Sequence, residues 1–166
     1  MIYAAVASSN DCIERHLERT IESVDEFVDK TIVFDGDWDG TQSSMDYFSH
    51  YEWIDKQRIQ FELVLPEGRW NTQAGKRAFM SNWGGPGSWC FFLDSDEILA
   101  AGGDWIRRAP QMNPNAGTFK VLIIERGKSM WRENMFAHGA FERGSKDVGV
   151  LPVVIEHLGL GETHVP

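Results

Sequence analysis

The sequence contains short, uninterrupted apolar runs that stop abruptly at polar or acidic residues. Residues 2–7 read IYAAVA, residues 31–34 read TIVF before Asp35, and residues 89–93 read WCFFL before Asp94. A short apolar run of this kind is typical of a strand buried on both faces, as strands in a parallel sheet usually are. This feature restricts the chain to folds that have a buried central sheet.

Amphipathic segments lie between these runs. Apolar residues recur at helical spacing from Ile13 to Val28, and residues 72–83 form a second helical pattern. A less regular helix is predicted at 45–53 and a strand at 59–65. Strands that alternate with helices predict an α/β fold with a mainly parallel central sheet flanked by helices, and ligands bound beyond the carboxyl ends of the strands.

The second half of the chain has weaker patterns. A short helix is predicted at 102–109, and strands are predicted at 118–125 and 150–156. The Gly, Asn and Pro residues between positions 100 and 146 predict loops in this region. At 166 residues, the chain has the size of one domain.

Composition and charge exclude several classes of partner. The formal net charge is -9, whereas a nucleic acid or an anionic membrane surface would require a basic face on the protein. Cys12 and Cys90 are the only cysteines and lack metal-binding spacing, which favours reduced thiols in the cytoplasm. We expect no transmembrane segment and no signal peptide, because no apolar stretch is long enough.

A cluster of carboxylates directly follows the most apolar strand. In the segment FFLDSDEIL, residues 91–99, Asp94, Asp96 and Glu97 fall within four positions. Carboxylates this close repel one another, and a hard cation such as Mg²⁺ or Mn²⁺ is a common way to relieve the repulsion. The alternative is a solvated acidic turn that caps a following helix.

These motifs resemble family 2 glycosyltransferases of the GT-A fold, in which an apolar strand leads into an Asp-x-Asp motif. Four segments match in order: IYAAVASSN at the start, IVFDGDWDGT around the second strand, GKRAFM in the helix before the motif, and FFLDSDEIL. The resemblance covers nearly the whole chain. It implies that residues 1–99 bind the nucleotide, that residues 100–166 form a shortened acceptor half, and that UDP- or GDP-sugar is the donor.

The resemblance also implies roles for individual residues. Asp35 would contact the base or ribose, Arg77 would lie near the nucleotide or its diphosphate, and Asp94 would face the ribose. Asp96 would be the principal ligand of Mn²⁺ or Mg²⁺, and His157, just after an apolar strand, would be a further ligand. A metal and a guanidinium at these positions would neutralise the charge that develops on a leaving diphosphate.

An inverting transfer needs a carboxylate that acts as general base on the acceptor hydroxyl. Glu133, in the segment MWRENM, is our candidate, and Glu142 and Asp147 compete with it. The acceptor itself, whether a glycan, a lipid-linked group or a protein, is open. Three tryptophans in predicted loops offer flat faces for a sugar ring: Trp38, Trp70 and Trp131.

Three other interpretations remain. The segment DWDGT, residues 37–41, matches the nucleophile loop of haloacid dehalogenase-like phosphatases, but the preceding apolar run ends at Phe34, too early for Asp37 to follow the strand directly. A nucleotidyltransferase would usually carry a Gly-rich, basic loop after the first strand, which ASSNDCIERH lacks. A non-catalytic binder of nucleotide sugars is the third possibility.

Overall fold

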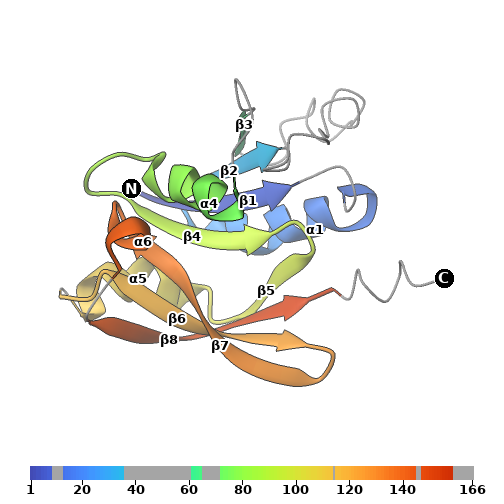
Figure 1. Ribbon diagram of the computed structural model, residues 1–166. Helices are drawn as coiled ribbons and strands as arrows, with labels where there is room; N and C mark the ends of the chain where they lie inside the picture. The colour runs from blue at the N-terminus through green and yellow to red at the C-terminus, as the bar shows by residue number, and fades with distance from the viewer. Residues whose placement is uncertain (9–12, 36–60, 65–71, 114, 145–146, 159–166) are drawn as a thin grey trace.

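The computed structural model describes residues 1–8, 13–35, 61–64, 72–113, 115–144 and 147–158 (Figure 1). The predicted helix at 45–53, the DWDGT segment, Trp38 and Trp70 lie outside the described residues. Within the described part, the strands are β1 (Ile2–Ser8), β2 (Lys30–Asp35), β3 (Phe61–Val64), β4 (Trp89–Asp94), β5 (Glu97–Ala101), β6 (Thr118–Glu125), β7 (Lys128–Ala137) and β8 (Val148–His157). The helices are α1 (Ile13–Val24), the 3₁₀ helix η1 (Asp25–Phe27), α4 (Gln73–Asn82), α5 (Asp104–Met112) and α6 (Ala140–Arg143).

All eight described strands belong to one sheet, in the order β3-β2-β1-β4-β7-β6-β8-β5. The first four strands are mutually parallel, as the sequence predicts. Their register aligns Asp35 of β2 with Ser8 of β1, and Asp94 of β4 with Ala7 of β1. The carboxyl ends of β2, β1 and β4 therefore form a continuous edge, with an acidic residue on each side of β1.

The second half of the sheet is mixed. β7 runs antiparallel to both β4 and β6, while β8 is parallel to β6 and β5 is antiparallel to β8. The helix predicted at 102–109 and the strand predicted at 118–125 are present as α5 and β6, whereas β7 and α6 occupy positions at which only loops were predicted. Strand β7 escapes prediction because its first six side chains are largely outside the core and form no apolar run.

The sheet curls strongly in this second half (Figure 1). β5 follows β4 after a two-residue turn, yet it pairs with β8 at the far end of the strand order. The segment β4-β7-β6-β8-β5 therefore bends round until its first and last strands meet at the turn of residues 94–97. We call the face enclosed by this bend the inner face; it carries the buried residues Val121, Ile123, Val153 and Ile155.

Two apolar clusters pack on the two faces of the sheet. Helices α1 and α5 cover the first, with Leu17 and Ile21 of α1 and Ile106 of α5 almost fully buried. Helices α4 and α6 cover the second through Met80 and Ala140. Burying one large aliphatic side chain contributes about 1.5–3 kcal/mol, so these contacts are the main source of helix stability.

The helix boundaries follow local chemistry. α4 begins after Thr72, whose hydroxyl accepts a hydrogen bond from Gly75 N at 2.9 Å, as an N-cap residue does. α1 ends at Val24, four residues earlier than the apolar spacing predicts, and the chain continues as η1 before Val28.

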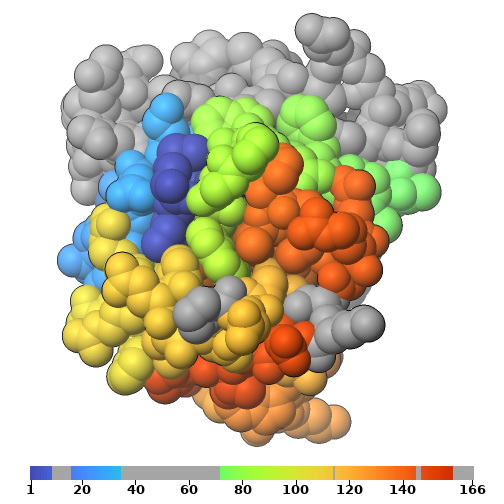
Figure 2. Space-filling view, turned by 90° about the vertical axis from the view of Figure 1, so that its left-hand side faces the viewer, coloured from blue at the N-terminus to red at the C-terminus, as the bar shows by residue number. Residues whose placement is uncertain are grey.

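The edge opposite the carboxyl ends is seen in Figure 2, where the start of β1, in dark blue, lies between the light-blue and yellow-green segments.

Candidate functional site

The acidic turn between β4 and β5 is held rigidly by backbone contacts from three directions. Ser95 N donates to Ala7 O of β1 at 3.0 Å, and Ser95 O accepts from the Thr20 hydroxyl of α1 at 3.0 Å. On the opposite side, Leu158 N donates to Asp96 O at 2.7 Å. The turn thus joins the first strand, the first helix and the end of β8. It is followed by a strand, so the alternative of a helix-capping turn is wrong.

Asp96 and His157 come together in this turn although they are far apart in the sequence. The Asp96 Oδ2 to His157 Nε2 distance is 2.7 Å, and both side chains are mostly buried. Burial raises the pKa of Asp96 above its ordinary value, although the neighbouring His157 opposes this shift. The two predicted metal ligands are therefore adjacent, one at the end of β4 and the other at the end of β8.

This contact is an ion pair at hydrogen-bond distance, which a cation shared by the two side chains would replace. Two neighbouring ligands of an octahedral Mg²⁺ or Mn²⁺ ion, each about 2.1 Å from the metal, lie about 3 Å apart. Within the described ranges, no group of three or more His, Cys, Asp and Glu side chains has the arrangement of a metal site. A cation on Asp96 and His157 would therefore take its remaining ligands from substrate and water, as Mg²⁺ commonly does.

Glu97, the third carboxylate of the cluster, is satisfied by the protein. Its side chain is 1% exposed and forms a bidentate ion pair with Arg132 of β7, with both N–O distances 2.9 Å. Glu97 Oε1 also accepts a hydrogen bond from Asp94 N at 2.9 Å. The expectation that a cation relieves the repulsion of all three carboxylates is therefore wrong for Glu97, because Arg132 neutralises it.

Arg132 itself is held in place by its neighbours. Its Nε donates to Asn134 Oδ1 at 2.8 Å, and Asn134 Nδ2 donates to Phe92 O of β4. Burial lowers the pKa of Arg132, but the hydrogen bonds and charge of Glu97 leave that pKa above its ordinary value. Sequence analysis missed Arg132; the unpaired buried charge that Glu97 would otherwise carry is the signal that a basic partner was required.

Asp94 and Arg77 form a second polar pair on the face covered by α4. Arg77 Nη2 lies 3.3 Å from Asp94 Oδ1, and its guanidinium lies 5.5 Å from the centre of the Phe92 ring. Burial and then the charge of Glu97 raise the pKa of Asp94, whereas Arg77 lowers it. The structure thus brings together two of the residues predicted to bind the nucleotide.

Lys76, beside Arg77, was not predicted. Its side chain is 4% exposed, and Nζ donates to Ser8 O, at the carboxyl end of β1, at 3.2 Å. A buried lysine at this edge adds positive charge where an anionic ligand would bind, in a protein whose net charge is -9. The segment GKRAFM contained this signal, because the two cations are adjacent in it.

Asp35 is the last residue of β2, and it pairs with Ser8, the last residue of the neighbouring strand β1. Since neighbouring strands are about 4.8 Å apart, Asp35 and Asp94 are separated by about 10 Å across the edge of the sheet. The role of Asp35 in nucleotide binding remains a prediction.

Glu133 is exposed on β7, opposite Lys120 of β6. Strand alternation places Glu133 and Arg132 on opposite faces of the sheet. Glu133 is on the face that carries Asp94. Its two competitors lie elsewhere: Glu142 accepts a hydrogen bond from Asn82 at the end of α4, and Asp147 precedes β8. Both of these positions are at the opposite edge of the sheet.

Trp131, expected in a loop, lies instead in β7 and is 55% exposed. No helix in the described part of the chain is long and apolar enough to cross a membrane.

Comparisons with known proteins identify the fold. No family model and no curated protein matches the sequence. Among solved structures, the chain is similar to a Bacillus anthracis protein assigned as a glucose-1-phosphate thymidylyltransferase and solved with sucrose (TM-score 0.60, 9% identity, covering 96% of this chain and 90% of that one). It is also similar to 4-diphosphocytidyl-2C-methyl-D-erythritol synthase from Anaerococcus prevotii (TM-score 0.58, 11% identity, 92% and 86% covered).

A third similar structure is mannose-6-phosphate isomerase from Helicobacter pylori (TM-score 0.54, 15% identity), in which the match covers 76% of this chain and 52% of that one. At these identities the likeness concerns the fold alone. The chain therefore has a mixed α/β fold similar to that of these three structures.

Proposed function

We propose that this chain is a metal-dependent glycosyltransferase that moves a sugar from a UDP- or GDP-sugar to an acceptor hydroxyl. One observation carries the proposal: Asp96 and His157 meet at 2.7 Å beside the carboxyl ends of the parallel strands. Ligands of open α/β sheets bind beyond such ends. An Asp-x-Asp turn joined by a histidine from the last strand matches the metal site that the GT-A resemblance implies.

In this proposal, Asp96 and His157 hold Mn²⁺ or Mg²⁺. The cation, when bound, would supply positive charge to the diphosphate as it leaves. Arg77 and Lys76, on the first half of α4, add two positive charges on the other side of the acidic turn. Asp35 and Asp94 would bind the nucleoside, because each ends a strand on one side of β1.

The acceptor hydroxyl would lose its proton to Glu133. This carboxylate lies on the same face of the sheet as Asp94, and of the three candidates it alone is not at the opposite edge. Glu133→Gln should therefore reduce kcat by about 10²–10⁴-fold while leaving donor binding intact. A location in the cytoplasm remains part of the proposal.

A nucleotidyltransferase is the second candidate function, and the comparisons favour it. Two of the similar structures carry names of nucleotidyl-transferring enzymes. Such an enzyme would join a nucleoside triphosphate to a sugar phosphate and release pyrophosphate. The absence of a Gly-rich, basic loop in the segment ASSNDCIERH is the reason for ranking it second.

The first experiment is a thermal-shift titration with UDP, GDP and the corresponding triphosphates, with and without Mn²⁺. A ligand at 100 times its Kd stabilises the folded state by about 2.7 kcal/mol, which raises the Tm of a chain of this size by about 5–10 °C. Asp96→Asn and His157→Gln should abolish the metal-dependent part of the shift. Asp29→Asn, at the opposite edge of the sheet, is the control and should retain it.

The second experiment separates the two candidate reactions by their products. Release of UDP or GDP from a nucleotide sugar supports sugar transfer, whereas release of pyrophosphate from a triphosphate and a sugar 1-phosphate supports nucleotidyl transfer. A nucleotide shift that does not depend on metal, or that persists in Asp96→Asn, would contradict the proposal.

A further inference from the structure

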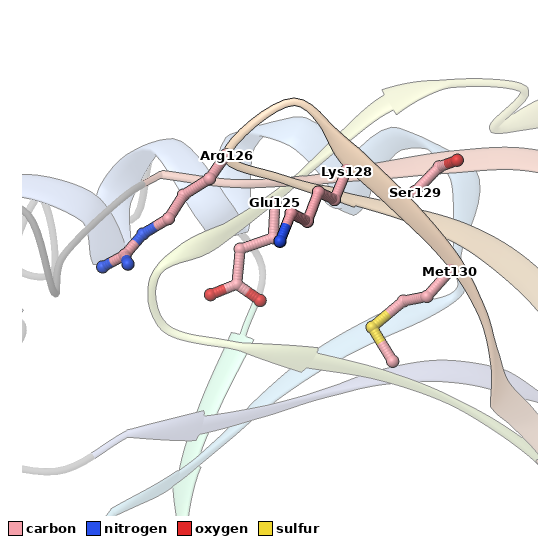
Figure 3. A pocket seen from close by; sticks show the side chains of 5 residues that line it. All are labelled: Glu125, Arg126, Lys128, Ser129 and Met130. Carbon is pink, nitrogen blue, oxygen red and sulfur yellow. The ribbon is translucent and has the colours of Figure 1, made fainter.

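A pocket of about 200 Å³ lies in the hairpin that joins β6 to β7 (Figure 3). It is lined by Glu125, Arg126, Lys128, Ser129 and Met130. None of these residues belongs to the metal turn or to the predicted nucleotide site. The pocket therefore needs an account of its own.

The strand register places this pocket beside the candidate metal site. In the parallel pairing of β6 with β8, Ile123 pairs with Ile155 and Ile124 with Glu156. One residue further along each strand come Glu125 and His157. Alternation puts both on the inner face, because Ile123 and Ile155 are buried there. A molecule in the pocket would thus lie one strand away from the residue that contacts Asp96.

The pocket is lined by two positively charged side chains and one negatively charged side chain. Arg126 and Lys128 line it together with the single carboxylate Glu125, in a chain whose overall charge is -9. Met130, which is 56% exposed, adds an apolar wall. In Figure 3, the side chains of Glu125, Lys128 and Met130 extend from the hairpin to the same side. Such a combination suits a ligand that has an anionic group, hydroxyls and an apolar ring face.

The backbone of the hairpin turn is unusual at Arg126. Its φ is 53°, followed by 75° at Gly127, which is the conformation of a two-residue turn that favours Asn-Gly. A left-handed conformation costs a non-glycine residue energy, and such residues concentrate at functional sites. An arginine at this position is therefore less favourable for the turn than an asparagine.

We infer that this pocket binds a sugar that bears a phosphate or a carboxylate. The pocket is on the inner face, whereas Glu133 is on the opposite face of β7, so this ligand is distinct from the acceptor that Glu133 would deprotonate. Arg126 and Lys128 hold the anionic group through charge-assisted hydrogen bonds, and Glu125 accepts a hydrogen bond from a sugar hydroxyl. Met130 contacts the apolar face of the ring.

The test measures binding without donor and without metal, so that its result is independent of the metal site. The methyl group of Met130 is followed by NMR in protein with ¹³C-labelled methionine methyls, and Met130→Leu assigns its signal. Glucose 6-phosphate, glucuronate, inorganic phosphate and glucose are titrated separately. We expect the two anionic sugars to shift the Met130 signal, and to bind about tenfold or more tightly than glucose.

The decisive variant is Arg126→Asn, because asparagine suits the turn while it removes the charge. The variant should keep or raise Tm and should weaken binding of the anionic sugars about tenfold or more. Lys120→Gln is the matched control: it removes one charge from the same hairpin, but from the opposite face of β6, and should leave binding unchanged.

Three results would overturn the inference. The first is equal binding of glucose and the anionic sugars, and the second is undiminished binding in Arg126→Asn. The third is inorganic phosphate binding as tightly as glucose 6-phosphate, which would exclude recognition of a sugar. If the anionic sugars bind but nucleotide and metal do not, the pocket stands and the proposed transferase function fails.

Discussion

The ion pair between Arg132 and Glu97 gives the sharpest prediction about the site. Glu97, whose side chain is 1% exposed, loses both of its hydrogen bonds to the guanidinium in Arg132→Met. Removing one partner of a buried pair typically costs 3–5 kcal/mol. Because Arg132 is itself 28% exposed, we expect the lower end, about 3 kcal/mol.

The loss should be visible in two measurements. Thermal unfolding should shift down by about 6–12 °C, since each kcal/mol moves the Tm of a chain of this size by about 2–4 °C. The second measurement is Mn²⁺ affinity by electron paramagnetic resonance. Glu97 accepts from Asp94 N, so a displaced Glu97 should loosen the acidic turn. If the proposed metal site exists, Mn²⁺ binding should then weaken about tenfold or more, as loss of a supporting contact commonly does.

A double-mutant cycle tests the cause. Glu97→Gln alone should cost about 1–3 kcal/mol, because the amide still accepts from Asp94 N but loses the charge-assisted pair. The double variant with Arg132→Met should be more stable than the sum of the single effects by about 1–2 kcal/mol. Arg107→Met, which breaks an exposed pair with Asp29, should cost less than about 1 kcal/mol. Additive effects within about 0.5 kcal/mol would refute the reasoning.

Other parts of the structure lead to further predictions. Hydrogen bonds from the backbone and from an arginine lower the pKa of Asp29. Its contribution to stability is therefore present above the unfolded pKa of about 3.9 and is lost as the pH falls through the folded value. In an acid titration followed by circular dichroism, Asp29→Asn should reduce the dependence of stability on pH in this range. Burial raises the pKa of Cys90, so in a Cys12→Ser background we expect no reaction with a thiol reagent at pH 8 until denaturant is added; rapid labelling of the native protein would contradict the buried placement. Gly102 has a φ of 84°, and an added Cβ would lie 2.0 Å from Pro152 O, so Gly102→Ala should destabilise the protein by more than about 1 kcal/mol in urea unfolding; an unchanged midpoint would refute the close packing of β5 against β8.

Local patterns were sufficient to predict those elements of the first half of the fold that lie within the described residues. β1, β2 and β4 are buried on both faces, so their apolar runs are visible without knowledge of their neighbours. α4 lies within the predicted range 72–83, and β6 occupies the predicted range 118–125. In each of these elements, the pattern of apolar and polar side chains within the segment itself shows which of its faces are buried.

The second half depends on contacts between distant segments. β5 has five residues and follows the acidic turn at once, so it lacks flanking loop signals. β7 begins with KSMWRE, whose side chains are mostly exposed, and it is stabilised by pairing with β6 and β4 rather than by its own pattern. Such pairing cannot be read from a single segment, and the mixed character of the sheet was missed for this reason.

The candidate site shows the same division. Asp96 and His157 were selected from a motif and a strand end, and their side chains lie 2.7 Å apart in the structure; their role as metal ligands stays a prediction. The pairing of Glu97 with Arg132 required the position of β7, which the sequence did not reveal. Lys76 was adjacent to a predicted residue, but its contact with Ser8 depends on how α4 packs against β1.

The position of β8 has a consequence for synthesis. This strand inserts between β6 and β5, both of which leave the ribosome before it does. Until residue 157 emerges, the nascent chain exposes two facing strand edges with open hydrogen-bonding groups, and such edges promote association with other chains. Chaperone demand during translation should therefore peak late, after most of the domain has been made.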